Sequence, residues 1–118
     1  MLLVHLVVAV LISAMSQSDS LHTQVDVALA QKDYRAMAKL LKRWKTQAPK
    51  DPWLQFYIAR WQEAMGKRDV AEQRYKAILK ATTIAKIVTQ ARQGLARLEQ
   101  LETDRRAAAI AAATAAAE

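Results

Sequence analysis

The sequence predicts an all-α chain of connected helices, and three observations support this prediction. The first is composition: Gly and Pro number two each among 118 residues, and Ala, Leu, Gln, Lys, Arg and Glu outnumber the strand formers. The second is a match of the chain to itself at a spacing of about 34 residues. The third is a set of helix-boundary signals that agree with that spacing. Because the length suffices for one small domain, we expect a single module.

The self-match is clearest where a pair of helices needs a tight turn or a residue packed between its members. A shift of about 34 residues aligns Lys32 with Gly66 at the turn. It also aligns three pairs that suit positions between packed helices: Val25 with Ala59, Leu41 with Tyr75, and Trp44 with Ile78.

The second helix pair has the clearer boundaries. Asp51 before Pro52 predicts a helix start, because the carboxylate accepts from free N–H groups and proline fits the first helical position. An apolar stripe then runs to Gly66, which suits a helix end, so we expect a helix over about residues 52 to 65. Asp69, with a glutamate three residues later, resembles a capping box that opens the return helix.

The remaining elements follow from the same signals. The first helix pair is expected over Leu21 to Gln31 and Tyr34 to Lys45, with Asp33 as the cap of its second helix. A last helix is expected over about Ile84 to Leu101, where it would cover the apolar side of the stack. The Ala-rich tail, residues 103–118, favours helix but buries little surface, so it predicts either an extension of the last helix or a frayed end. We assign the tail no function.

Residues 1–18 form a separate apolar segment ahead of the helical domain, which we place at residues 19–102. Met1 to Met15 contains only one histidine and one serine as polar side chains. Three interpretations stay open: a membrane anchor, the apolar part of a cleaved export signal, or an apolar helix packed on the domain. This stretch is shorter than the roughly 20 residues that span a bilayer, and it lacks the Lys or Arg with which an export signal usually opens. An inserted segment would leave the domain on the cytoplasmic side of a membrane; otherwise we expect a cytoplasmic protein.

The composition excludes several kinds of function. Without cysteine the chain has no disulfide, no thiolate zinc site and no cysteine nucleophile. The two histidines, His5 and His22, lack further ligands at metal-binding spacing. Because no convergent set of titratable groups is visible, we expect no catalysis, no cofactor and no metal. The formal charge is +7 and belongs to residues from Asp19 onward, which favours an acidic partner.

The second helix pair resembles a tetratricopeptide (TPR) repeat. The residues that carry the resemblance are small or glycine at three positions and aromatic at the fourth: Ala59, Gly66, Ala71 and Tyr75. In the first pair, the acidic-aromatic sequence Asp33-Tyr34 and the later Pro49 match the same pattern, whereas Val25, Met37 and Trp44 stand where the family prefers small residues. The resemblance covers residues 19–102, and with the apolar N-terminus it extends to small membrane-associated TPR proteins of bacteria, cyanobacteria included.

The resemblance implies a short α-solenoid of antiparallel helix pairs with a closing helix, whose first helices line a concave groove for a peptide of a partner protein. Position by position, it implies these partner-binding residues: Trp53, Phe56, Arg60 and Glu63 from the second pair, His22, Asp26 and Leu29 from the first, and Gln90, Gly94 and Arg97 from the last helix. Family members that clamp chaperone tails use Lys and Asn where this chain has His22, Asp26 and Tyr57. We therefore do not expect chaperone-tail binding.

Two groups of residues have more than one interpretation. Trp44 and Trp61 are expected in the core, and Trp53 suits either the core or a partner contact. The basic residues fall mainly on the second helices of the pairs, where a solvated face is the simplest interpretation. The alternative to an adaptor is that this basic face binds an anionic membrane surface or nucleic acid, although no nucleic-acid motif is present.

Overall fold

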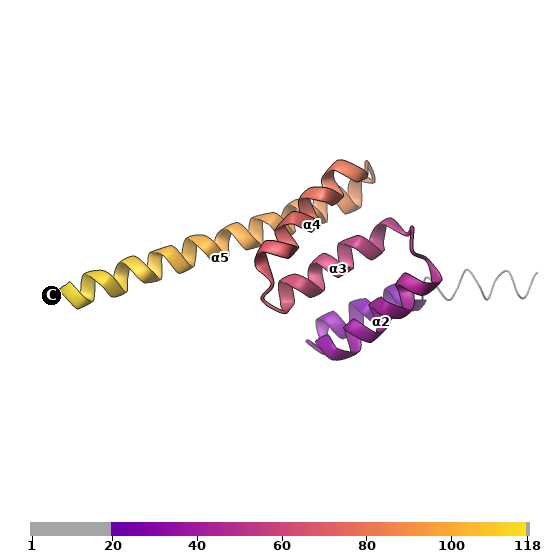
Figure 1. The fold of residues 1–118 in the computed structure, drawn as a ribbon, viewed down its shortest axis with the longest axis horizontal. Coiled ribbons are helices and arrows are strands. Elements are labelled where there is room, and N and C mark those ends of the chain that lie inside the picture. Colours follow the sequence, from indigo (N-terminus) through magenta and orange to yellow (C-terminus); the bar gives the residue numbers. More distant parts are fainter. Residues whose placement is uncertain (1–19, 118) are drawn as a thin grey trace, which may run out of the picture.

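The computed structural model describes residues 20–117, and this part of the chain is helical apart from short connections. A first helical segment, residues 20–30, is followed by α2 (Tyr34–Gln47), α3 (Pro52–Ala64), α4 (Arg68–Ala81) and α5 (Ala85–Ala117). No strand occurs among the described residues, which confirms the all-α prediction. Each connection has three or four residues, so consecutive helices fold back on one another (Figure 1).

Two of the predicted helix caps are confirmed. Asp33 Oδ1 accepts a hydrogen bond from the backbone N–H of Ala36 at 3.1 Å, at the start of α2. Asp51 Oδ1 accepts from the N–H of Trp53 at 3.0 Å, and Pro52 takes the first position of α3. Each cap satisfies one N–H group that the first helical turn leaves without a backbone partner.

The capping box predicted at Asp69 is wrong. Helix α4 begins at Arg68, its cap is Lys67, and no side chain bonds the free N–H groups there. The second turn repeats the first, with Gly66 and Lys67 in the places of Lys32 and Asp33. Because α2 begins directly after Asp33, α4 begins directly after Lys67, before Asp69. The Asp69 carboxylate instead lies in the first turn, where the positive end of the helix dipole favours it.

The two turns that close the helix pairs have the same backbone geometry. Lys32 and Gly66, 34 residues apart, both have positive φ, at 57° and 77°. In the first turn Lys32 N donates to Leu29 O and Asp33 N to Ala28 O; in the second, Gly66 N donates to Glu63 O and Lys67 N to Gln62 O. Every donor and acceptor is displaced by 34 residues. Lys32 takes a conformation that glycine adopts more readily, so the first turn is the more strained one.

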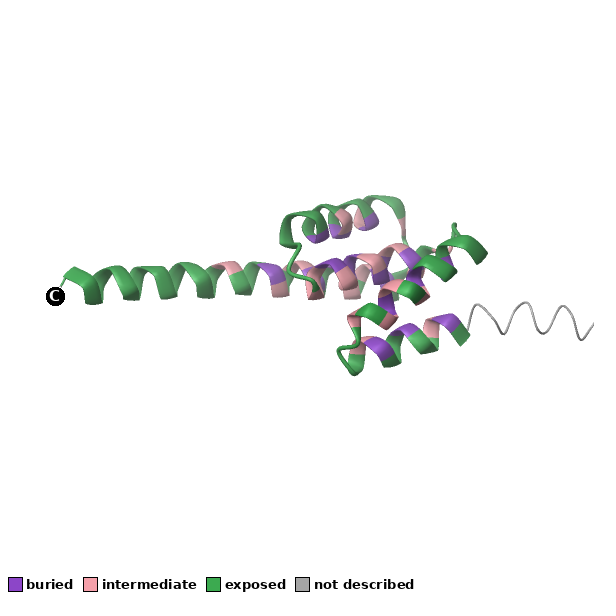
Figure 2. Cartoon of the chain, turned by 60° about the horizontal axis from the view of Figure 1, so that its bottom comes forward, coloured by how far each residue is buried: buried purple, intermediate pink, exposed green. Residues whose placement is uncertain are grey.

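The core repeats at the same spacing. Val25 and Ala59 are both fully buried, and the aligned pairs Leu41 with Tyr75 and Trp44 with Ile78 are buried as well. Figure 2 shows that buried residues line the surfaces where helices face each other. Trp44 is in the core as expected, while Trp53 and Trp61 are partly buried against it.

Helix α5 continues through the Ala-rich tail to Ala117, so of the two alternatives expected for the tail the structure shows the extension of the last helix. Its first half packs on the body through Ile87, Ala91, Gly94 and Leu98. Residues 103–117 are exposed throughout, so only the high helix propensity of alanine favours helix there (Figure 2).

Gly94 allows α5 to approach α4 closely. A methyl group at this position would lie 2.4 Å from Cζ of Tyr75, a fully buried side chain. Glycine is therefore required by packing at this point and not by backbone conformation.

The expectations for residues 1–18 lie outside the described residues. Among residues 20–117, no helix combines the length and apolarity needed to cross a membrane.

Candidate functional site

The residues expected to bind a partner lie on the first helical segment, α3 and α5. These three elements alternate along the chain with α2 and α4. Polar side chains of the three elements form two groups, each held together by hydrogen bonds or ion pairs. We call the surface that they form the alternate-helix face; its polar members are His22, Asp26, Tyr57, Arg60, Glu63 and Arg97.

The first group joins His22, Asp26 and Tyr57. The Tyr57 hydroxyl donates to Asp26 Oδ1 at 2.5 Å, and its oxygen lies 2.9 Å from His22 Nε2. Because the single hydroxyl proton goes to Asp26, the oxygen accepts from His22, which places a proton on Nε2. The three side chains therefore tie the first helical segment to α3.

Aromatic rings hold this group in position. The His22 ring lies 5.5 Å from Trp44, 5.3 Å from Trp53 and 5.0 Å from Tyr57, between ring centroids. Burial and, next, the hydrogen bond to Asp26 raise the pKa of Tyr57 far above its ordinary value. The hydroxyl is thus a fixed donor at neutral pH, whereas the side chains of Asp26 and His22 stay 53% and 32% exposed.

The second group is centred on Glu63. Arg97 Nε and Nη2 donate to its two carboxylate oxygens at 2.9 and 3.0 Å, and the Tyr75 hydroxyl donates at 2.7 Å. Arg60 adds a longer ion pair at 3.5 Å. Because Arg97 belongs to α5 and Tyr75 to α4, this carboxylate links three helices.

The protonation of Glu63 follows from these partners. Burial by itself would raise the pKa of Glu63, but the hydrogen bonds from Arg97 and Tyr75 and the charges of Arg97 and Arg60 outweigh it, so the pKa falls below 4.5. The hydrogen bond to Glu63 likewise raises the pKa of Arg97. The pair is therefore fully ionised at neutral pH and holds α5 against α3.

A hollow of about 480 Å³ opens on the alternate-helix face between the two groups. Its walls come from the first helical segment, the following turn, the start of α2, α3 and α5. They include Asp26, Leu29, Ala30, Tyr34, Arg60, Glu63 and Leu101. The hollow thus offers both charges and an apolar floor to a side chain from outside.

The structure distributes the expected contact residues unevenly. His22, Asp26, Arg60 and Arg97 keep exposed surface, and Trp53 and Gln90 are partly buried. Phe56, in contrast, is only 3% exposed and packs on Tyr57 and Tyr75, so it belongs to the core and offers no contact area. The Glu63 side chain is 11% exposed and is occupied by its ion pair with Arg97.

Sequence reasoning missed two features of this site. Gly94, expected in the groove, is buried under Tyr75. The link between Glu63 and Arg97 also went unnoticed, although the sequence contains a signal for it. The two residues carry opposite charges and stand 34 residues apart, which is the repeat spacing.

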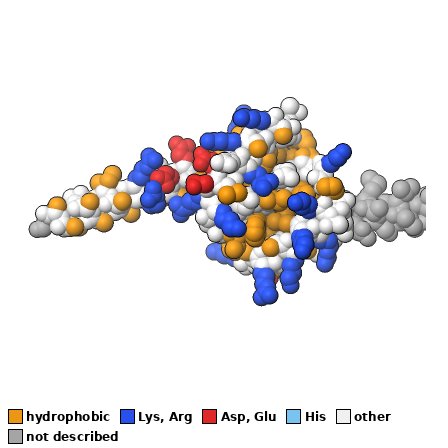
Figure 3. Space-filling view, in the orientation of Figure 1, with side chains coloured by type: hydrophobic (Ala, Val, Ile, Leu, Met, Phe, Trp, Pro, Cys, Tyr) orange, Lys and Arg blue, Asp and Glu red, His pale blue; other side chains and the backbone are white. Residues whose placement is uncertain are grey.

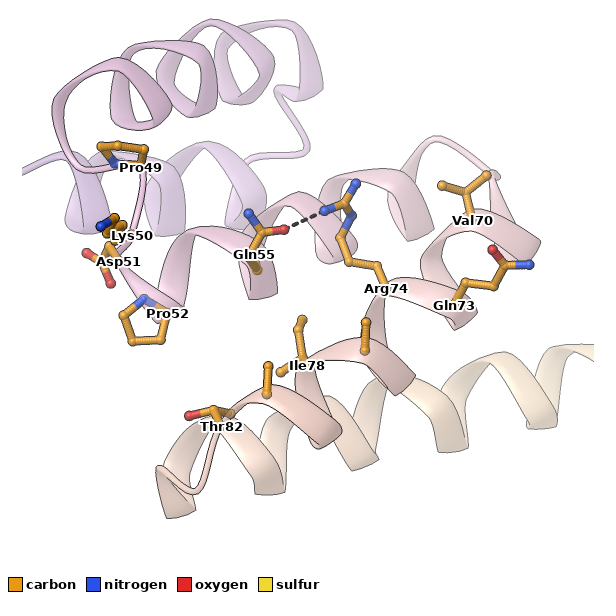
Figure 4. Close-up of a pocket in the computed structure, with 12 residues that line it drawn as sticks. Pro49, Lys50, Asp51, Pro52, Gln55, Val70, Gln73, Arg74, Ile78 and Thr82 are labelled. Carbon is orange, nitrogen blue, oxygen red and sulfur yellow. Dashed lines mark hydrogen bonds between the residues drawn. The ribbon is translucent and has the colours of Figure 1, made fainter.

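A larger hollow of about 810 Å³ lies between α3 and α4, away from this face (Figure 4). It shares no lining residue with the smaller hollow. Arg74 projects from α4 toward Gln55 of α3 and donates to the Gln55 side-chain oxygen.

We compared the chain with known protein families, curated proteins and solved structures. No family model, no curated protein and no solved structure is significantly similar to the chain.

Proposed function

We propose that the chain is a TPR-like protein-interaction module that binds a peptide segment of a partner protein on the alternate-helix face and catalyses no reaction. The observation that supports this proposal best is the 34-residue recurrence of turn hydrogen bonds and buried positions. Repetition of this kind stacks helix pairs and aligns their first helices side by side, which creates an extended binding surface.

The chemistry of the face fits a peptide rather than a small substrate. The exposed groups carry both signs, with Asp26 and His22 at one side and Arg60 and Arg97 at the other. The hollow between them takes one or two side chains, and partly buried Trp53 lies next to His22. Aromatic and arginine side chains at the centre of an interface commonly supply most of its binding free energy.

The remaining expectations form part of this proposal. The module spans residues 19–102, the first half of α5 closes the stack, and the tail lies outside the binding face. Membrane association would come from residues 1–15 as an anchor, with the module on the cytoplasmic side. Without an anchor, we expect the module in the cytoplasm.

The test is affinity purification of the tagged full chain from its own cells, followed by mass spectrometry. Ala30→Glu places a charge in the hollow without removing any described contact, because Ala30 is exposed and lines it. Ala108→Glu adds the same charge on the exposed tail as a matched control. We expect partners recovered with the control to be lost with Ala30→Glu and with Trp53→Ala. Equal recovery by all variants would contradict the proposal.

A second candidate function rests on the charge of α2 and α4. Exposed Lys and Arg side chains on these helices surround the body in Figure 3, and the visible carboxylates gather where α5 leaves it. This surface suits anionic lipid or nucleic acid, and such binding would weaken steeply as salt rises. Flotation with phosphatidylserine vesicles and gel shifts with oligonucleotides at low salt test it; no binding in either assay excludes it.

A further inference from the structure

The hollow between α3 and α4 has apolar walls. They come from the connection before α3, the first turn of α3 and one side of α4: Pro49, Pro52, Val70, Ala77, Ile78 and Ala81. Val70 is 48% exposed, although most large apolar side chains of the body are buried. Figure 4 shows the hollow open between these elements. Its volume of about 810 Å³ holds several side chains.

Arg74 brings an unneutralised charge to this apolar hollow. Its Nε donates to Gln62 Oε1 at 3.1 Å and its Nη1 to Gln55 Oε1 at 2.5 Å (Figure 4). Both acceptors are neutral amides, and Gln62 is only 8% exposed. Within residues 20–117, no carboxylate lies at ion-pair distance from Arg74. The guanidinium therefore keeps its full charge and three N–H donors for a ligand.

The other charged groups of the hollow carry both signs. Lys50 lines its edge. Asp51 lines it as well, but its two oxygens already accept from Trp53 N and Trp44 Nε1. Because the wall is apolar, an added carboxylate meets Arg74 in surroundings that strengthen a charge-assisted hydrogen bond.

We propose that this hollow is a second protein-docking site, which takes an amphipathic helical segment of a partner. The segment inserts large apolar side chains between α3 and α4 and places an Asp or Glu carboxylate on Arg74. A guanidinium binds a carboxylate through two parallel hydrogen bonds, which gives the site its preference for acidic segments.

The chain's own tail is the obvious competitor for an apolar hollow, through a second copy. The tail, residues 103–118, has carboxylates at Asp104 and Glu118, but Ile110 is its one large apolar side chain among alanines. A single isoleucine does not fill a hollow of about 810 Å³, so the chemistry favours a different partner. The inference is also independent of the alternate-helix face, because the two hollows share no residue.

The experiment is an NMR titration of the ¹⁵N-labelled full chain with two synthetic peptides. One is a helix of about four turns with leucines along one face and two glutamates beside them; its twin carries glutamines instead. We expect the acidic peptide to shift the amides of residues 49–55 and 70–82 and to bind at least about fivefold more tightly than the twin. Shifts at residues 22–30 and 60–63 instead, or equal binding of the twin, would overturn the proposal.

Variants separate the charge from the fold. Ala77→Glu adds a carboxylate three residues from Arg74 on an exposed lining position, so it supplies the counter-charge from within the chain and should abolish binding. Ala77→Gln has nearly the same size and should retain most of it. Arg74→Lys should weaken binding, whereas Lys80→Gln, on the same helix outside the hollow, should not. If Ala77→Glu binds as well as Ala77→Gln, or if the labelled chain self-associates through this hollow, the proposal fails.

Discussion

Replacement of Gly94 by alanine tests how closely α5 packs on α4. The added methyl carbon would lie 2.4, 2.6 and 2.8 Å from three ring carbons of Tyr75, well inside ordinary contact distances of about 3.5 Å. Tyr75 is fully buried, and its hydroxyl bonds Glu63 at 2.7 Å. The ring therefore cannot move without losing that hydrogen bond.

The expected cost follows from three contributions. Overpacking of a filled core costs about 1–3 kcal/mol, here near the upper value because the overlap involves the rigid ring. Loss of a hydrogen bond to a charged group costs about 1.5–3 kcal/mol. The alanine gains about 1 kcal/mol of helix propensity. The free energy of unfolding should thus fall by about 4 kcal/mol, which lowers the melting temperature by roughly 15 °C or more.

Urea unfolding followed by circular dichroism measures this change. Tyr75→Leu shortens the side chain, and in that background Gly94→Ala should become neutral or stabilising by up to about 1 kcal/mol. Ala96→Gly, an exposed position on α5, gives the propensity difference by itself. Our account of the helix contact is refuted if Gly94→Ala costs the same in both backgrounds.

Four further predictions follow from the fold. Glu63 has a folded-state pKa below its unfolded value, so its stabilising contribution is present above pH 4.5 and lost as the pH falls through the folded pKa. Urea unfolding between about pH 6 and about pH 3 should therefore show a smaller acid loss for Glu63→Gln than for the parent chain. Asp51→Ala removes the acceptor of two hydrogen bonds and should cost about 1–2 kcal/mol; a melting temperature unchanged from the parent would contradict the capping role. Lys32→Gly relieves a positive φ and should stabilise by up to about 1 kcal/mol, whereas the same change at exposed Lys39 inside α2 should destabilise. Deletion of residues 107–118 should reduce helical circular dichroism yet leave the melting temperature of the body unaltered, and a lower melting temperature would mean that the tail packs on it.

Helix placement was predictable from local chemistry. Asp33, Asp51 with Pro52, and Gly66 each act within one helical turn, and the predicted ends of α3 lie within one residue of the observed ones. The capping box at Asp69 was wrong for a reason that the sequence alone does not show. The turn determines where α4 starts. Its backbone hydrogen bonds repeat those of the first turn, but it has no side-chain cap like the one that Asp33 provides there.

The binding residues were harder to predict, because their exposure depends on tertiary packing. A helical position on the correct face can still be covered by a neighbouring helix, as Phe56 is covered beside Tyr75 and Gly94 lies beneath it. Arg74 illustrates the opposite case. In the sequence it is one of many basic residues, and only the fold places it between two neutral glutamines in an apolar hollow.

The exposed half of α5 extends from the body as a continuous helix. From Ala107 to Ala117 it extends roughly 16 Å as one unbroken helix of exposed residues (Figure 1). Because the helix is continuous with the part that packs on α4, any rotation of the body is transmitted along it. A fluorophore or tag attached beyond residue 117 would lie away from both hollows. Because the helix that carries it is rigid, its orientation would report the orientation of the body.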